Sequence, residues 1–178
     1  MSEISELAGD LTGLADQLPL IIRRELTTTA LRAEAGAKQL TTTRLRVRSG
    51  SLRNSIQSQV EADGDSVRAT IQAGSELAYA RIQEEGGTIT PVMGRFLAIP
   101  VGPALTGAGV AKTSPRQVPG LHFEPRGPRL ADDQGRTWFL LKTSVTLKPK
   151  RFLADAVDAA LEQLPEQLGQ AVDALVGG

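Results

Sequence analysis

The sequence contains one histidine, His122, and no cysteine, so two side chains that often act as bases, nucleophiles or metal ligands are scarce. His122 lies in a Gly/Pro-rich stretch without a Ser or Cys partner pattern near it. An ordinary metal site needs several His, Cys or carboxylate ligands at fixed spacing. The adjacent Glu84 and Glu85 would point about 100° apart on a helix, so they do not form an acid–base pair. We therefore expect no catalytic residue, no metal site and no bound cofactor.

The stretch from Gly107 to Thr113 has a partial likeness to a phosphate-binding loop. In such a loop, a glycine precedes the lysine and an apolar strand leads directly into the turn. Here Ala111 precedes Lys112, and no apolar strand leads directly into the stretch. The pattern does not predict nucleotide binding, and we expect the protein not to be an enzyme.

The most basic stretch lies between Glu34 and Glu61, with no acidic residue between them. Its arginines are Arg44, Arg46, Arg48 and Arg53. Such a cluster can contact phosphate groups, so one alternative is a nucleic-acid-binding module that uses residues 44–53. Because no aromatic residue is interleaved to stack on bases, we favour a solvated or subunit-facing charged surface.

The composition limits the partners that the chain can attract. Twenty basic and twenty acidic residues give a net charge of zero, so no overall field draws the protein to nucleic acid or to an anionic membrane. No segment has the apolar run of a signal peptide or a membrane span. We expect a soluble protein, made in the cytoplasm, that has no membrane partner. A chain of 178 residues is most simply a single domain.

Both ends of the chain are predicted to be helical. Apolar residues recur at steps of three and four from Ile4 to Leu18, which predicts a helical arm over residues 1–18. Pro19 should kink or restart this helix, because proline has no amide hydrogen. After Pro149, a stripe of apolar residues predicts a C-terminal helix over 151–176, bent or broken at Pro165.

Strands are predicted between these helices, within an α+β core over residues 19–153. The turn Asp63-Gly64-Asp65 predicts a hairpin of residues 57–62 and 66–73. A short helix over 75–85 should stop at a glycine pair. A further strand is predicted at residues 95–101. The turn Asp132-Asp133-Gln134-Gly135 predicts a second hairpin of residues 129–131 and 136–147, of which 137–145 has the strongest strand pattern. The resulting fold class is α+β, with an antiparallel sheet built from hairpins, a short inserted helix and a C-terminal helix packed on the sheet.

Residues 102–120 are dominated by Gly, Pro, Ala, Ser and Thr. A loop of this length inside a compact domain favours mobility, or order that is gained on binding a partner. We therefore predict that this segment is mobile in the free protein.

Three short sequence elements occur in an order and at a spacing that resemble a tail-component family of long-tailed bacteriophages. Residues 48–56, Arg-Ser-Gly-Ser-Leu-Arg-Asn-Ser-Ile, resemble the family element T-G-x-L-R-x-S-I. Residues 79–88, Tyr-Ala-Arg-Ile-Gln-Glu-Glu-Gly-Gly-Thr, are similar to Y-A-x-x-x-E-aromatic-G-T. Residues 144–153, Ser-Val-Thr-Leu-Lys-Pro-Lys-Arg-Phe-Leu, resemble S-V-x-I-P-x-R-P-F-L. The resemblance spans roughly residues 25–165.

The chain departs from these elements at several positions. Ser49 replaces a threonine, Glu85 stands where the family usually has an aromatic residue, and Arg151 stands where it usually has proline. The segment from Pro91 to Gly135 is a long insert relative to the shorter family members. These departures bear on the packing around Tyr79 more than on the fold.

The resemblance implies a structural virion protein of the neck, at the head–tail junction. By this analogy, copies of the chain form a ring of six subunits that completes or terminates the tail. The ring joins the tail tube protein to the capsid connector, and DNA passes through its channel without sequence-specific contact. The residues that the resemblance marks as candidate assembly or interface residues are Ser51, Leu52, Arg53, Tyr79, Glu84, Gly86, Arg151 and Phe152.

Overall fold

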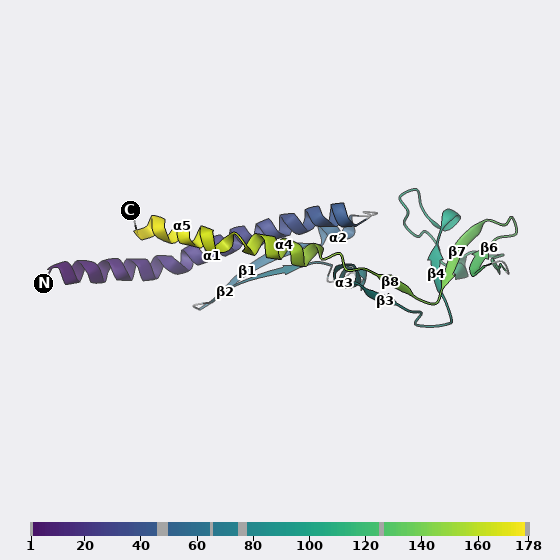
Figure 1. Cartoon of the computed structure of the whole chain (residues 1–178), viewed down its shortest axis with the longest axis horizontal. Coiled ribbons are helices and arrows are strands. Elements are labelled where there is room, and N and C mark those ends of the chain that lie inside the picture. Colours follow the sequence, from purple (N-terminus) through teal and green to yellow (C-terminus); the bar gives the residue numbers. More distant parts are fainter. Residues whose placement is uncertain (1, 46–49, 65, 75–77, 125–126, 177–178) are drawn as a thin grey trace. The chain divides into compact units, whose positions relative to one another are not determined.

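The structure, a computed structural model, describes residues 2–45, 50–64, 66–74, 78–124 and 127–176, with side chains from Thr12 onward except Ala78. The chain divides into two compact units, which we describe separately. The helical unit comprises Met1–Leu45, Ser51–Ala80 and Arg151–Gly178, and the sheet unit comprises Arg46–Gly50 and Arg81–Lys150. Figure 1 labels most of the helices and strands of both units. Within the described ranges, no helix combines the length and the apolar character that crossing a bilayer requires.

The helical unit is built along one long helix, α1 (Ser2–Arg44). The predicted N-terminal helix is confirmed. Of the two outcomes predicted at Pro19, a kink or a restart, the restart does not occur, since Pro19 lies inside α1. Proline removes one backbone hydrogen bond from a helix. Helix propagation on both sides of it adds one bond for each residue, so α1 continues through this position.

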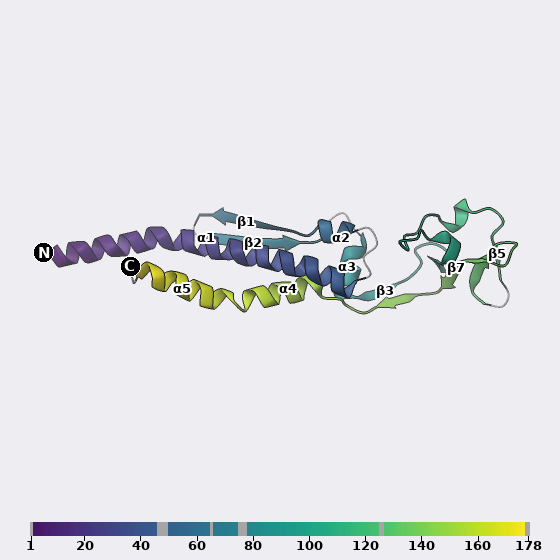
Figure 2. The ribbon, with the colours of Figure 1, turned by 90° about the horizontal axis from the view of Figure 1, so that it is seen from above.

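Two layers lie against opposite sides of α1, as Figure 2 shows. One layer is the antiparallel ribbon of β1 (Gln57–Asp63) and β2 (Ser66–Gln72). The other layer contains α4 (Phe152–Leu161) and α5 (Leu164–Val176). The predicted first hairpin is confirmed, and Gly64 occupies the turn with a φ of 55°, a conformation that glycine adopts without a Cβ penalty.

The predicted α+β fold class is confirmed, but the predicted packing of the C-terminal helix on the sheet is wrong, because α1 offers the small side chains against which this helix packs. The C-terminal helix consists of two segments, α4 and α5, and Pro165 lies in the first turn of α5, where a missing amide costs little. Both segments pack along α1, on the side away from the ribbon (Figure 2).

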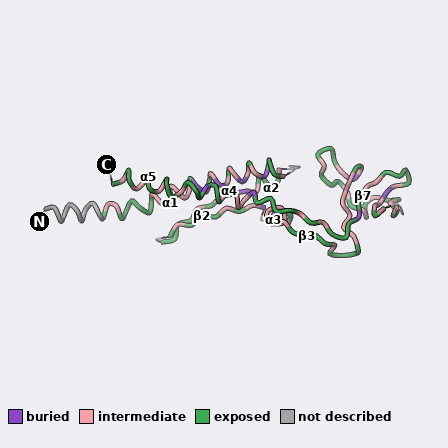
Figure 3. The backbone as a smooth tube through the Cα atoms, in the orientation of Figure 1, coloured by how far each residue is buried: buried purple, intermediate pink, exposed green. Residues whose placement is uncertain are grey.

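Small side chains let α1 and α4 approach closely. Ala33 and Ala37 on α1 and Ala156 on α4 are buried. A Cβ placed on Gly36 would lie 3.4 Å from the Cβ of Ala156, so the two helices meet at van der Waals distance. Buried positions gather where α1, α2 (Ser51–Asn54) and α4 meet, and again on β7 (Thr137–Lys142) in the sheet unit (Figure 3).

The sheet unit contains the C-terminal part of α3 (Ala78–Glu85) and two antiparallel sheets. The smaller sheet pairs β3 (Gly87–Ile89) with β8 (Val145–Leu147). The larger sheet has the order β4-β7-β6-β5, with bounds β4 Leu97–Pro100, β5 His122–Phe123, β6 Arg129–Ala131 and β7 Thr137–Lys142. The predicted second hairpin is confirmed by the pairing of β6 with β7. Its predicted second arm, residues 136–147, is divided between two sheets, because β7 ends at Lys142 and β8 begins at Val145.

The segment from residue 102 to residue 120 contains local structure. It includes two 3-10 helices, η1 (Gly102–Ala104) and η2 (Pro115–Gln117), and a bridge between Leu105 and Ala111. Ala104 is fully buried. The mobility of this segment in the free protein stays a prediction, as does the assignment of the whole chain to a single domain.

Candidate assembly surface and its supporting core

The three sequence elements that carry the resemblance contribute to one hydrophobic core in the helical unit. Leu52 and Ile56 come from the first element, Ala80 from the second and Phe152 from the third. Ile56 is 0% exposed and Phe152 is 1% exposed. The cluster is completed by Ala37 and Ala156. Leu52 and Phe152 therefore support the fold from inside, and side chains so buried do not present a surface to another molecule.

Ser55, in the first element, fixes the end of the ribbon. Its hydroxyl donates a hydrogen bond to the carbonyl oxygen of Leu52 at 2.8 Å and accepts one from the amide of Gly74 at 2.9 Å. The second bond satisfies the amide of Gly74, which would otherwise need another partner in this part-buried place. We had not singled out Ser55 from the sequence; its place in the first element was the available signal.

Gly86 is required by the close approach of two backbone segments in the sheet unit. Its φ is 73°, and a Cβ at this position would lie 2.7 Å from the nitrogen of Pro149 and 2.9 Å from the oxygen of Leu147. The amide of Lys150 donates to the carbonyl oxygen of Gln83 at 2.9 Å, which joins the end of α3 to the chain that follows β8. The predicted helix stop at the glycine pair is confirmed, because α3 ends at Glu85 and β3 begins at Gly87.

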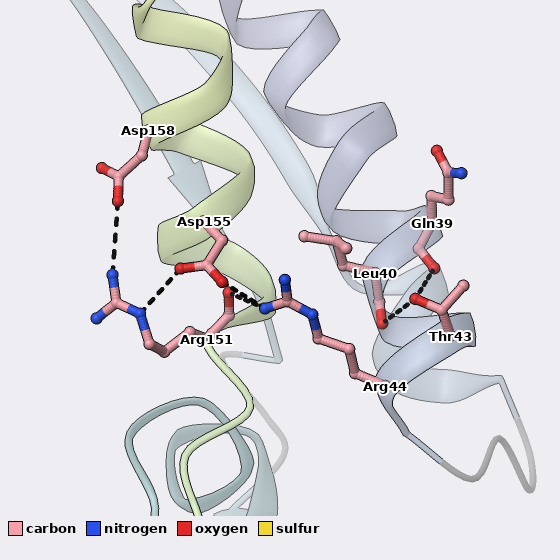
Figure 4. Close-up of polar contacts among 7 residues, drawn as sticks. All are labelled: Gln39, Leu40, Thr43, Arg44, Arg151, Asp155 and Asp158. Atoms are coloured by element: carbon pink, nitrogen blue, oxygen red, sulfur yellow. Dashed lines mark hydrogen bonds and ion pairs between the residues drawn. The ribbon is translucent and has the colours of Figure 1, made fainter.

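Arg151 precedes α4 in a left-handed conformation, with a φ of 43°. Proline, which the family usually has at this position, is held near a φ of −65° and could not adopt it. The Arg151 side chain donates to Asp155 at 2.8 Å and lies 3.5 Å from Asp158 (Figure 4). Arg44, at the end of α1, donates to Asp155 at 2.5 Å and to the Arg151 carbonyl oxygen at 3.1 Å. This cluster connects the C-terminal end of α1 to the N-terminal end of α4.

Two carboxylates of the helical unit are held in their charged form by these contacts. The hydrogen bond from Arg44, followed by that from Arg151, lowers the pKa of Asp155 below its ordinary value. Glu34 on α1 accepts a hydrogen bond from Lys38 at 2.6 Å, from the Ser58 hydroxyl at 2.6 Å and from the Ser58 amide at 2.8 Å. The bond from Lys38 is the largest cause that lowers the pKa of Glu34. Glu34 thereby connects α1 to β1.

The remaining candidate residues are more accessible. Ser51 and Arg53 on α2 are exposed, Tyr79 is 44% exposed, and Glu84 is half-buried. A tyrosine with this much of its ring in solvent offers both apolar area and a polar tip to a partner. Of the eight candidates, Ser51, Arg53, Tyr79 and Arg151, whose side chain is 56% exposed, can contact another subunit directly.

The basic stretch is described in part. Arg46 and Arg48 lie outside the described residues. Arg44 is held by Asp155 and by the carbonyl of Arg151, so its charge is partly neutralised within the unit. Arg53 is exposed on α2. The contacts of Arg44 do not favour a phosphate-binding surface over residues 44–53.

His122 lies on β5, where its side chain is 49% exposed and its Nδ1 is 3.7 Å from an oxygen of Asp133. In the part of the chain that the structure describes, no three His, Cys, Asp or Glu side chains are grouped to hold a metal ion.

Comparison with known families identifies the class to which this arrangement relates. Residues 5–86 match the model of the HK97-gp10-like family, described as "Bacteriophage HK97-gp10, putative tail-component". The predicted resemblance to a phage tail-component family is confirmed over these residues, which include most of α1, the ribbon and α3. Searches of curated proteins and of solved structures found no match.

The match shows that residues 5–86 are similar to a family described as putative tail components of bacteriophages. It contains the first sequence element and most of the second, while the third, at residues 144–153, lies beyond it. The third element nevertheless supplies Phe152 to the core that the first two elements build. The packing thus connects the C-terminal helices to the matched segment.

Proposed function

We propose that the protein is a structural component of the phage head–tail junction, where copies of it form a ring. The ring completes or terminates the tail and joins it to the capsid connector. The observation that carries the proposal is the match of residues 5–86 to a tail-component family, together with the core that all three sequence elements share. A shared core explains why residues so far apart in the sequence occur as one set.

The proposed partners are copies of the chain itself, the tail tube protein and the connector. Six copies in a ring require a head-to-tail interface that closes on itself. DNA passes through the channel without sequence-specific contact, and the protein is made in the cytoplasm of the host bacterium before it enters the neck of the virion.

We assign different parts of the site to different tasks in this assembly. The exposed Tyr79 and Arg53 contact a neighbouring subunit or the tail tube, while Leu52 and Phe152 hold the helices that present them. Residues 102–120 become fixed on docking.

The test is to measure the mass of the purified full-length chain in solution and then to mix it with tail tubes and with connectors. We expect a ring in electron micrographs, and density at the ends of the tubes. Tyr79→Ala should weaken tube binding, and Leu161→Ala is a control because Leu161 is also exposed, at 45%, but lies outside the three elements. A chain that stays monomeric and binds neither tubes nor connectors would contradict the proposal.

A further inference from the structure

The ribbon of β1 and β2 has two outer edges, and the geometry of the chain shows which backbone groups point out of each. The Ser58 amide donates to Glu34, so it points away from β2. Outward and inward amides alternate along an antiparallel strand, so the amides of Val60 and Ala62 point the same way. We call these two amides the open β1 edge.

The cross-strand pairing then defines the other edge. Ser58, Val60 and Ala62 lie opposite Ile71, Ala69 and Val67. Two residues that face each other without exchanging hydrogen bonds both direct their amides outward. The amides of these three β2 residues form what we call the open β2 edge. None of the amides of either open edge is hydrogen-bonded within the described part of the chain.

Such edges are unusual for a monomer. A two-stranded ribbon is marginally stable without further support, and unpaired edges are templates for pairing with another strand. α1 covers one face of this ribbon, but the described structure places no third strand beside it. The Ser58 amide, near one end of β1, already donates a hydrogen bond to Glu34. The amides of Val60 and Ala62 are therefore the donors available to a partner strand on that edge.

We propose that the open β2 edge of one copy pairs with the open β1 edge of a second copy. The inference rests on the proposed self-assembly and names its interface. β1 and β2 run in opposite directions, so two copies in the same orientation bring β2 of one beside β1 of the next as antiparallel strands. Each copy would then use one edge on each side, which is the head-to-tail arrangement that can close into a ring.

Charge on the outer face of the ribbon favours a second copy as the occupant. β1 carries Glu61 and Asp63, β2 carries Arg68, and Arg68 lies opposite Glu61 within the ribbon. If Ala69 lies opposite Val60 of the next copy, Arg68 also lies opposite the Glu61 of that copy. Opposite charges that face each other across adjacent strands are favourable, and this register repeats at every interface.

The experiment uses proline at outward positions of the full-length chain. Ala69→Pro removes an amide of the open β2 edge, and Ala62→Pro removes one of the open β1 edge. Proline is tolerated at edge positions whose amide points to solvent, so the ribbon itself should persist, which circular dichroism checks. Ala69→Val and Ala62→Val keep the amides and are the matched controls.

Sedimentation velocity should show that each proline variant needs about tenfold or more protein to assemble, since the loss of a hydrogen bond and a blocked edge costs at least one decade of affinity. The valine controls should assemble as the wild type does. A mixture of the two proline variants should form a dimer, because Ala69→Pro retains the open β1 edge and Ala62→Pro retains the open β2 edge.

A second measurement needs no variant. The amides of Val67 and Ala69 should exchange with solvent quickly in the diluted wild-type monomer and slowly in the assembled protein. Fast exchange in the assembly, or assembly of both proline variants at wild-type concentrations, would overturn the edge pairing while leaving the proposed function intact. Dimers of one proline variant alone would overturn the head-to-tail arrangement. Wild-type protein that neither self-associates nor binds tail tubes would overturn both proposals.

Discussion

At the residue scale, a position can require glycine because its φ is positive or because a Cβ would clash with neighbouring atoms, and Gly64 and Gly86 allow these two causes to be measured separately. Both have positive φ, but a Cβ at Gly64 meets nothing within 4 Å, whereas at Gly86 it would meet backbone atoms at 2.7–2.9 Å. A left-handed non-glycine residue costs roughly 1–2 kcal/mol. Overpacking adds about 1–3 kcal/mol.

We therefore predict that Gly64→Ala lowers the free energy of unfolding by the cost of the left-handed conformation alone. Gly86→Ala should lower it by that cost and the overpacking cost together. Denaturant unfolding of the two variants measures the difference. Equal losses would show that the neighbours of Gly86 move aside.

Asp132 gives a second residue-scale prediction. It accepts a hydrogen bond from the indole nitrogen of Trp138 at 2.9 Å and one from Arg136 at 2.8 Å. The bond from Trp138 is the largest of the causes that lower the pKa of Asp132 from 3.8 to about 2. A carboxyl whose pKa is lower in the folded state stabilises the fold fully above its ordinary pKa. This stabilisation is lost as the pH falls from about 3.8 to about 2.

Trp138 is the one tryptophan of the chain, so its fluorescence reports on Asp132. We expect an acid transition with a midpoint near pH 2, which Asp132→Asn removes. Circular dichroism over the same range distinguishes this local transition from acid unfolding. A midpoint near pH 3.8 would show that the hydrogen bond does not perturb Asp132.

The sequence predicted the inward positions of individual residues better than their polar partners. A short helix capped by Ser49 or Ser51 would turn Leu52 and Ile56 inward, and both residues are buried. The bonds of Arg44 to Asp155 and of Ser58 to Glu34 join residues far apart in the chain. Arginine, aspartate, glutamate and serine are common on solvated surfaces, so the sequence does not identify which of them are partners.

At the scale of elements, the contact between α1 and α4 depends on small side chains. Ala156→Leu adds volume where Gly36 and Ala37 lie close by, and overpacking should lower the free energy of unfolding by about 1–3 kcal/mol. Ala159→Leu on the exposed side of α4 is the control. Alanine and leucine are both good helix formers, and an exposed substitution should change stability by at most about 0.5 kcal/mol. Similar losses in both variants would contradict a close contact between the two helices.

Strand positions could be predicted from the sequence, but strand partners could not in every case. The two hairpins were predicted because turn residues mark local pairing, and both are observed. β8 instead pairs with β3, far away in sequence. A period-two pattern predicts which side chains share a face, but it does not identify which other strand pairs with the one that carries it.

The continuous helix through Pro19 shows a similar limit of sequence patterns. The local cost of proline in a helix is outweighed by the hydrogen bonds of the long helix around it.

For the molecule as a whole, residues 102–120 provide a test of assembly. The elements η1 and η2 have three residues each, and the remaining pairing is a single bridge. We predict rapid amide exchange at these residues in the free subunit and slower exchange after binding to tail tubes. Residues of β7, at the centre of the larger sheet, are the control and should be protected in both states. Strong protection of the segment in the free subunit would refute its predicted mobility.

The division into two units had no clear signal in the sequence. The helical unit takes three separate segments of the chain, so no linker marks its boundary. The second and third sequence elements, residues 79–88 and 144–153, are each continuous in the sequence. Each is divided between the two units, because the unit boundaries lie after Ala80 and before Arg151. Contacts between distant segments decide such boundaries, and neither composition nor periodicity reports them.

The pairing of β3 with β8 has a consequence for how this chain can gain or lose material. Ile89 and Val145 are cross-strand partners, so the entire four-stranded sheet leaves and rejoins the chain at two neighbouring points. Replacing residues 90–144 with a two-residue turn would preserve β3, β8 and their register. Lengthening this segment would also leave both strands and their register unchanged. The β3–β8 pair is thus a natural junction for modular exchange, at which one recombination event could equip the same helical unit with a different appendage.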